Sequence, residues 1–181
     1  MPRTGELVAM PDELTMKRHR DLEGRRKDRW IRRARVALVG ALCVAGLLNV
    51  FGQRPADAST ATDRARLELR APRRVRGGLL FQARFTIRAL RELKDARLVL
   101  ARGWTEGLTI NTLEPSPLGE ASSDGRLSLD LGHVPAGEEH VLYVQFQVNP
   151  TTIGWRRSQD VLLYDGQTHL LTQRRSLTIF P

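Results

Sequence analysis

The amino-acid sequence predicts a mainly β protein, an antiparallel β-sandwich of about seven or eight strands preceded by one transmembrane helix and a basic N-terminal tail. Three observations predict this: an apolar run from Val36 to Phe51, a cluster of Lys and Arg before it, and short segments of alternating polarity after it. The expected parts are a cytoplasmic tail at 1–33, a membrane helix at 34–53, a linker at 54–64 and an extracytoplasmic domain at 65–181.

The basic tail accounts for much of the net charge of +9 on this chain of 181 residues. Residues 1–35 contain 11 Lys or Arg and 6 Asp or Glu. Positive charge that borders an apolar run is typical of a membrane flank and does not predict a nucleic-acid partner. The tail lacks sustained apolar periodicity, so we expect it to be disordered or partly helical and to contact anionic lipid headgroups.

The apolar run is interrupted only by Asn49 as a strongly polar residue. As a helix it would extend roughly 24 Å, a little less than the ~30 Å hydrocarbon core of a bilayer. Arginine side chains can extend outward from the ends of such a run, and a tryptophan can lie at the headgroup level. We therefore predict a membrane anchor whose defining residues are Trp30, Arg35, Val36, Phe51 and Arg54.

The distribution of Lys and Arg predicts the orientation of this anchor. Ten basic residues lie between Lys17 and Arg35, whereas Arg54 is the only one between the apolar run and Arg64. The positive-inside rule then places the N-terminus in the cytoplasm and the C-terminal domain outside a single-pass cell membrane protein.

A cleaved signal peptide is the alternative interpretation of the same run. Ala56-Asp57-Ala58 has the small-x-small form of a cleavage site, and cleavage there would give a secreted protein that begins at Ser59. The run is longer than a usual hydrophobic region of a signal peptide, and a long basic segment precedes it, which favours a retained anchor.

Small residues recur along the predicted membrane helix. Ala37, Ala41 and Ala45 are spaced four residues apart, with Gly40 beside them. This spacing places them on one helix face and predicts close packing against a helix of another membrane or envelope protein, or of a second copy. Alanine and glycine are common in membrane helices, so the stripe can also lack a partner.

The segments after residue 64 alternate between apolar and polar side chains. The clearest is LFQARFTIRAL at 80–90, where Phe81, Phe85 and Ile87 share one face and arginines the other. Gly77-Gly78 and Asp165-Gly166 predict tight turns, and residues 114–125 predict a loop. The other expected strands lie at 65–71, 96–101, 108–113, 126–132, 140–148 and 176–180, and residues 161–171 form two short strands on either side of Asp165-Gly166.

One stretch carries a family resemblance. The sequence LDLGHVPAGEEHVLYVQFQV resembles a signature of bacterial cell-surface immunoglobulin-like domains, matched at Gly132, Val134, Gly137 and Phe146. The resemblance implies an immunoglobulin-like sandwich at the cell surface but no ligand. The whole chain is also similar to short, arginine-rich, single-pass proteins of actinobacteria, a group that supplies no catalytic residues to transfer.

The sequence contains no recognisable catalytic motif, and we predict a non-enzymatic protein without a cofactor or metal. An enzyme with an unrecognised site is the less favoured alternative. The histidines of the domain lack metal-ligand spacing, and no nucleophile elbow or phosphate loop occurs. Trp104 and Trp155 lie beside arginines in expected loops. Each is either a contact residue or a cap over an open end of the sandwich. An arginine face of Arg84, Arg88 and Arg97 would suit an acidic partner if the three were coplanar.

Overall fold

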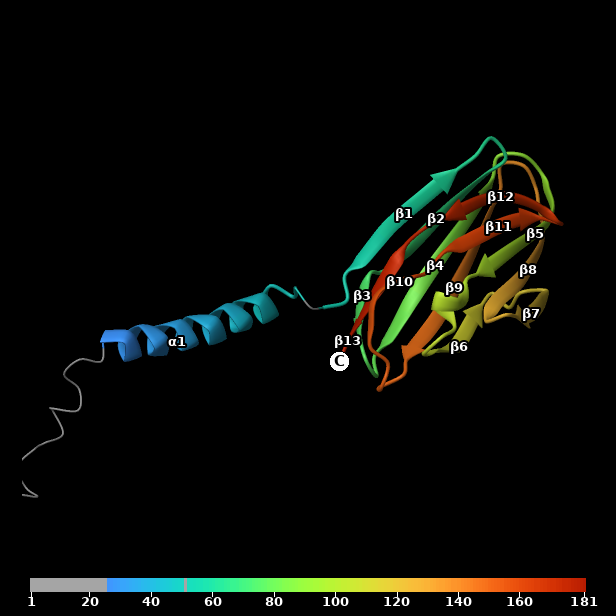
Figure 1. Ribbon diagram of the computed structural model, residues 1–181. Coiled ribbons are helices and arrows are strands. Elements are labelled where there is room, and N and C mark those ends of the chain that lie inside the picture. Colours follow the sequence, from blue (N-terminus) through green and yellow to red (C-terminus); the bar gives the residue numbers. More distant parts are fainter. Residues whose placement is uncertain (1–25, 51) are drawn as a thin grey trace, which may run out of the picture. The chain divides into compact units, whose positions relative to one another are not determined.

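The computed structural model describes residues 26–50 and 52–181. The chain divides into one compact unit that ends at Leu47 and a second, the β-domain, that comprises Leu48–Pro181. The first contributes helix α1 and the second all the strands (Figure 1). The elements are α1 (Arg26–Leu47), β1 (Pro55–Ala61), β2 (Ala65–Pro72), β3 (Arg74–Arg76), β4 (Leu80–Ala89), β5 (Leu93–Leu100), a 3-10 turn (Arg102–Trp104), β6 (Leu108–Glu114), β7 (Gly119–Ser123), β8 (Arg126–Val134), β9 (Glu139–Val148), β10 (Gly154–Ser158), β11 (Val161–Asp165), β12 (Thr168–Gln173) and β13 (Ser176–Phe180).

Helix α1 begins and ends earlier than the predicted helix at 34–53. It includes part of the predicted tail at 1–33, of which residues 1–25 lie outside the described residues. It ends at Leu47, and Asn49 then takes a left-handed backbone conformation with φ of 53°, which cannot continue a helix. Phe51, a predicted anchor residue, also lies outside the described residues.

Within residues 26–50 and 52–181, no helix combines the length and the apolar character that a membrane crossing requires.

The segment predicted as a linker at 54–64 contains a strand instead. All seven residues of β1 pair with β2 in antiparallel register, from Pro55 opposite Pro72 to Ala61 opposite Arg66. Its side chains alternate between exposed and half-buried, but most of them are short alanines, serines and threonines with little apolar contrast. A hydropathy pattern therefore does not reveal the alternation of this strand. Because β1 begins at Pro55, only residues 48–54 separate helix α1 from the sandwich.

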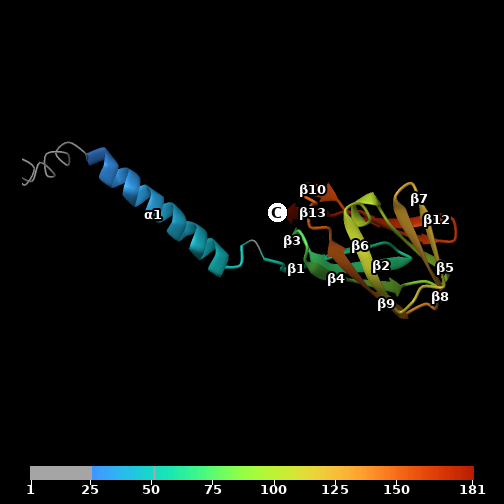
Figure 2. The same ribbon diagram turned by 90° about the horizontal axis from the view of Figure 1, so that it is seen from below.

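Two five-stranded antiparallel sheets form the sandwich (Figure 2). Their strand orders are β1-β2-β4-β9-β6 and β12-β11-β5-β8-β7. The orders β2-β4-β9-β6 and β12-β11-β5 correspond to the A-B-E-D and G-F-C sheets of an immunoglobulin fold. The predicted mainly β, immunoglobulin-like sandwich is therefore confirmed, although the described residues contain thirteen strands instead of seven or eight.

The additional strands come largely from segments predicted as loops. β7 lies within the predicted loop at 114–125 and forms a hairpin with β8 around Asp124 and Gly125, both with positive φ. β10 joins β13 and β3 in a small third sheet, in which β13 and β3 run parallel. These strands are short and polar, so a search for buried alternating faces does not detect them.

The hydrophobic core lies between the two large sheets, as the alternating pattern predicted. Phe85 and Phe146 from one sheet and Leu98 and Leu163 from the other are fully buried. The turns predicted at Gly77-Gly78 and Asp165-Gly166 join β3 to β4 and β11 to β12. Trp104 packs into this core, with ring centroids 5.5 Å from Phe85 and 5.2 Å from Phe146.

Candidate interaction surfaces

Helix α1 exposes large apolar side chains along its second half. They are Val36, Leu38, Val39, Leu42, Val44 and Leu47. At the start of the helix Trp30 is 70% exposed, with the Arg33 guanidinium 5.8 Å from its ring centroid. The small residues Ala37, Gly40, Ala41 and Ala45 lie on the same helix, and their packing role stays a prediction.

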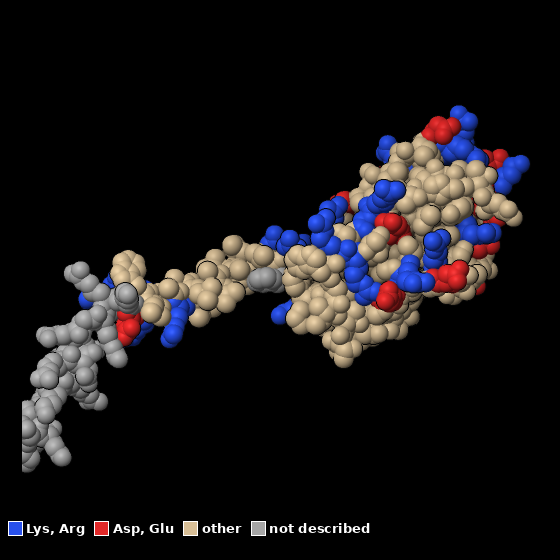
Figure 3. All heavy atoms as spheres, in the orientation of Figure 1, with Lys and Arg blue, Asp and Glu red and all other residues tan. Residues whose placement is uncertain are grey.

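Five exposed arginines gather at the end of the β-domain where the chain enters it. We call this surface the basic end and define it as Arg54, Arg73, Arg74, Arg76 and Arg156. Strand pairing brings them together: Arg74 lies opposite Thr178 of β13, whose hydroxyl accepts a hydrogen bond of 3.4 Å from the Arg156 amide. Figure 3 shows basic atoms gathered in the region that Figure 1 labels β3 and β10.

The basic end surrounds the entering chain. The Arg54 guanidinium donates a hydrogen bond to the Leu48 carbonyl, and Arg74 Nη1 donates to the Val50 carbonyl at 3.1 Å. A hollow of about 320 Å³ lies here, lined by Asn49, Val50, Gly52, Arg54, Pro55, Ala56, Arg73 and Arg74. Arginines thus form both the rim and part of the wall of this hollow.

The positive charge of this end is not neutralised within the described part of the β-domain. None of the five arginines forms an ion pair with an Asp or Glu of that part. Behind them lies the buried Arg175, which donates to the Pro72 carbonyl at 2.5 Å and lies 5.2 Å from the Trp104 ring centroid. Burial and the charge of Arg73 together lower the pKa of Arg175 to about 10, as expected in an electropositive surrounding.

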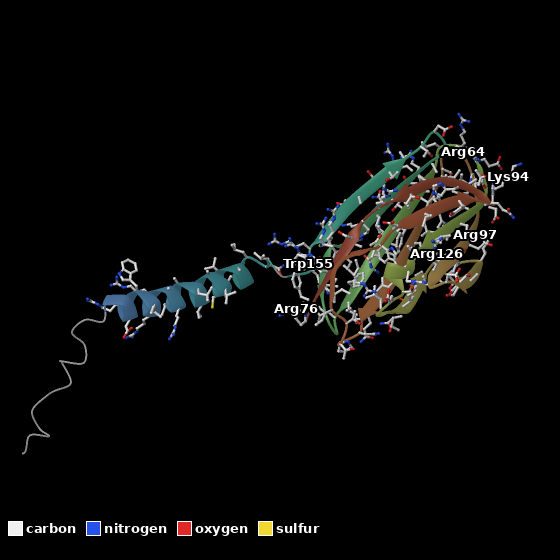
Figure 4. All side chains as sticks on the ribbon, viewed as in Figure 1. Arg64, Arg76, Lys94, Arg97, Arg126 and Trp155 are labelled. Carbon is white, nitrogen blue, oxygen red and sulfur yellow. The ribbon has the colours of Figure 1, made fainter. Side chains whose placement is uncertain are left out.

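The two candidate contact tryptophans have opposite environments. Trp104 is fully buried and its indole Nε1 donates to the Gln159 carbonyl at 3.1 Å, so it packs inside the β-domain and presents no exposed surface to a partner. Trp155 is 76% exposed and does not cap the sandwich. Strand β10 bulges at this point, because the register against β13 shifts between Gly154 and Arg157. Figure 4 shows Trp155 and Arg76 at the same end of the β-domain.

A second surface lies on the outer face of the β1-β2-β4-β9-β6 sheet. Two hollows of about 430 and 360 Å³ share Arg70 and Arg84 in their walls. Arg70 pairs with Asp57 at 3.6 Å, whereas Arg84 has no ion pair with another described residue. Arg97 lies in β5 of the opposite sheet, so Arg84, Arg88 and Arg97 do not share one face and the condition for a common acidic partner is not met.

The histidines of the β-domain do not converge. The Nε2 atom of His133 lies 2.9 Å from Glu92 Oε1, and that of His169 lies 2.8 Å from the Thr172 hydroxyl. His140 is partly buried, and this burial lowers its pKa below 6.5. Across the described ranges, no group of three His, Cys, Asp or Glu side chains could hold a metal ion.

Comparison with known protein families finds no match, and comparison with curated proteins finds none either. Solved structures share a likeness at low identity. One is AvmM, described as catalysing macrocyclisation in alchivemycin A biosynthesis (9% identity, TM-score 0.47, 71% of this chain and 95% of that one). Two are cohesins, CaCohA2 from Clostridium acetobutylicum (10%, 0.43, 69% and 96%) and a non-cellulosomal cohesin from Archaeoglobus fulgidus (15%, 0.38, 59% and 85%). With TM-scores below 0.5, they carry no argument about function.

Proposed function

We propose that the protein is a membrane-anchored, non-catalytic interaction module, with helix α1 as its anchor and the β-domain outside the cytoplasm. The observation that carries this proposal is the exposed apolar surface of α1. Leu38, Leu42 and Leu47 are 63%, 57% and 86% exposed, and arginines flank the run at Arg35 and Arg54. Apolar side chains exposed over several turns are stable when lipid or another helix covers them.

The pairing of β1 favours a retained anchor over cleavage after Ala58. Such cleavage would divide β1 and remove Pro55–Ala58 from its register with β2. It would also release Val50, whose carbonyl accepts a hydrogen bond from Arg74 of β3. Because β1 pairs with β2 on both sides of Ala58, the sheet supports a chain that is not cleaved there.

An interaction role for the β-domain is supported by its surface. Arg84 has no ion pair with another described residue and lies between two hollows of the outer sheet face. It lies on the long strand β4, so a partner would meet a preformed surface. The partner that the proposal implies is another envelope protein or a second copy of the chain.

Flotation of the full chain with lipid vesicles tests the anchor. The pair of substitutions Val39→Asp and Leu42→Asp should abolish co-flotation, because each carboxylate costs about 3 kcal/mol in the centre of a bilayer helix. Leu118→Asp is the matched control, since Leu118 is 77% exposed in the β-domain. Equal flotation of all three proteins would contradict the proposal, and a mature N-terminus at Ser59 found by mass spectrometry would favour the secreted form.

A further inference from the structure

The basic end has the composition of a surface that binds lipid phosphates. Arg73, Arg74 and Arg76 are exposed on and beside β3, and no carboxylate of the described residues pairs with them. Trp155 and Ile153 are 76% and 69% exposed on and beside β10, which β13 connects to β3. Arginine forms strong hydrogen bonds with phosphate groups, and tryptophan is enriched at the interface between membrane and water.

The path of the chain determines which partner can reach this surface first. Helix α1 ends at Leu47, and the Val50 carbonyl is already hydrogen-bonded to Arg74 in the β-domain. Residues 48–54 could span at most about 25 Å if fully extended. An anchor in α1 would therefore hold the basic end close to the bilayer surface, where an anionic leaflet presents phosphates at high density.

We infer that the basic end docks the β-domain onto anionic lipid headgroups, with phosphates at Arg54, Arg73, Arg74 and Arg76 and Trp155 at the interface. This inference rests on the proposed anchoring and assigns the orienting contact to residues of the β-domain. Docking would leave the outer sheet face with Arg84 and the opposite end of the sandwich free for a protein partner.

A fluorophore beside Trp155 tests the docking in the full chain. Cys43 is the only cysteine, so a Cys43→Ser background allows one label at Ile153→Cys and, as the control, one at Leu90→Cys. Leu90 is 46% exposed at the opposite end, where its amide donates to the Arg64 carbonyl. The chain is reconstituted into vesicles of phosphatidylcholine with and without phosphatidylglycerol, each containing a lipid that carries a quencher near its headgroup.

We expect quenching at position 153 to exceed quenching at position 90, to increase with phosphatidylglycerol and to fall in high salt. The combined change of Arg73, Arg74 and Arg76 to Gln should remove the phosphatidylglycerol dependence, with about a fivefold loss of the docking equilibrium constant for each arginine. Replacing Arg66, Arg88 and Arg97 by Gln removes the same charge from strands of the two large sheets and should leave quenching unchanged.

The outcomes separate this inference from the proposed function. A chain that does not float with vesicles overturns the anchor and the docking together. A chain that floats but shows equal quenching at positions 153 and 90 overturns the docking alone. Equal losses in the two triple variants would also overturn it, because net charge would then explain the effect without a defined surface.

Discussion

The two ends of the β-sandwich use their arginines in different ways. At the end that contains the β1–β2 turn and the β11–β12 hairpin, Arg64 contacts Asp165 at 2.6 Å and Arg91 contacts Asp63 at 3.5 Å. At the basic end, the exposed arginines reach backbone carbonyls or solvent. Figure 4 shows Arg64 and Arg76 at these opposite ends. The arginines at the first end are therefore paired with carboxylates of the β-domain, whereas those at the basic end are available to a partner.

The largest expected effect concerns the core beneath the basic end. Trp104→Ala should lower the free energy of unfolding by about 3–5 kcal/mol, because it leaves a cavity between Phe85 and Phe146. Trp155→Ala is the control and should change it by less than about 0.5 kcal/mol, since its ring is exposed. Urea denaturation measures both. A similar loss in the two variants would show that Trp155 also supports the fold.

The next effect concerns the paired end. Asp165 Oδ1 accepts backbone hydrogen bonds from Lys94 at 2.9 Å and Asp95 at 3.1 Å, in addition to the ion pair with Arg64. Asp165→Ala should therefore cost about 2 kcal/mol of stability in urea denaturation. Asp63→Ala removes a pair in which both side chains are mostly exposed and should cost less than about 0.5 kcal/mol. If both variants lost the same amount, the backbone contacts of Asp165 would be unimportant.

The same carboxylate predicts a dependence of stability on pH. Burial raises the pKa of Asp165, but the Asp95 amide and Arg64 outweigh burial and hold it below its ordinary value of 3.8. A carboxylate with a lowered pKa stabilises the fold above the unfolded value and loses this contribution as the pH falls through 3.8 and below. Thermal unfolding at a series of acidic pH values should show a shallower decline for Asp165→Ala. Parallel profiles for the two proteins would contradict this assignment.

A smaller pH effect should arise at His140 of β9. Burial lowers its pKa, so the unfolded chain binds a proton more readily than the folded domain does. Its contribution is complete above pH 6.5 and is lost as the pH falls from 6.5 toward the folded pKa. Thermal unfolding between about pH 5 and 7 should show a flatter stability profile for His140→Gln than for the unmodified chain. Identical profiles for the two proteins would exclude burial of His140 as the cause.

The smallest expected effect concerns the basic end itself. Arg73→Gln, Arg74→Gln and Arg76→Gln should each change the free energy of unfolding by less than about 0.5 kcal/mol, because their side chains are exposed and lack ion pairs. Urea denaturation of the single variants in low salt measures this. A loss of more than about 1 kcal/mol in any of them would identify that arginine as part of the fold.

Local alternation in the sequence was sufficient to predict the inward faces of the long strands. In β4, for instance, Phe81, Phe85 and Ile87 lie inward, as a strand with one buried face requires. The glycine turns were predictable for the same reason, since Gly78 and Gly166 take positive φ within their own short segments. Strand β1 escaped prediction because its Ala, Ser and Thr side chains differ little in polarity.

The sequence by itself thus determined the sandwich and the apolar, arginine-flanked character of α1, because both depend on residues close together in the chain. Only the tertiary structure decided which tryptophan is core and which is surface. Trp104 and Trp155 each follow a glycine near arginines, but only Trp104 contacts Phe85, Phe146 and Arg175 from distant parts of the chain. The pairing of Arg64 with Asp165, 101 residues apart, and the gathering of unpaired arginines at the other end likewise depend on strand order, which local patterns do not specify.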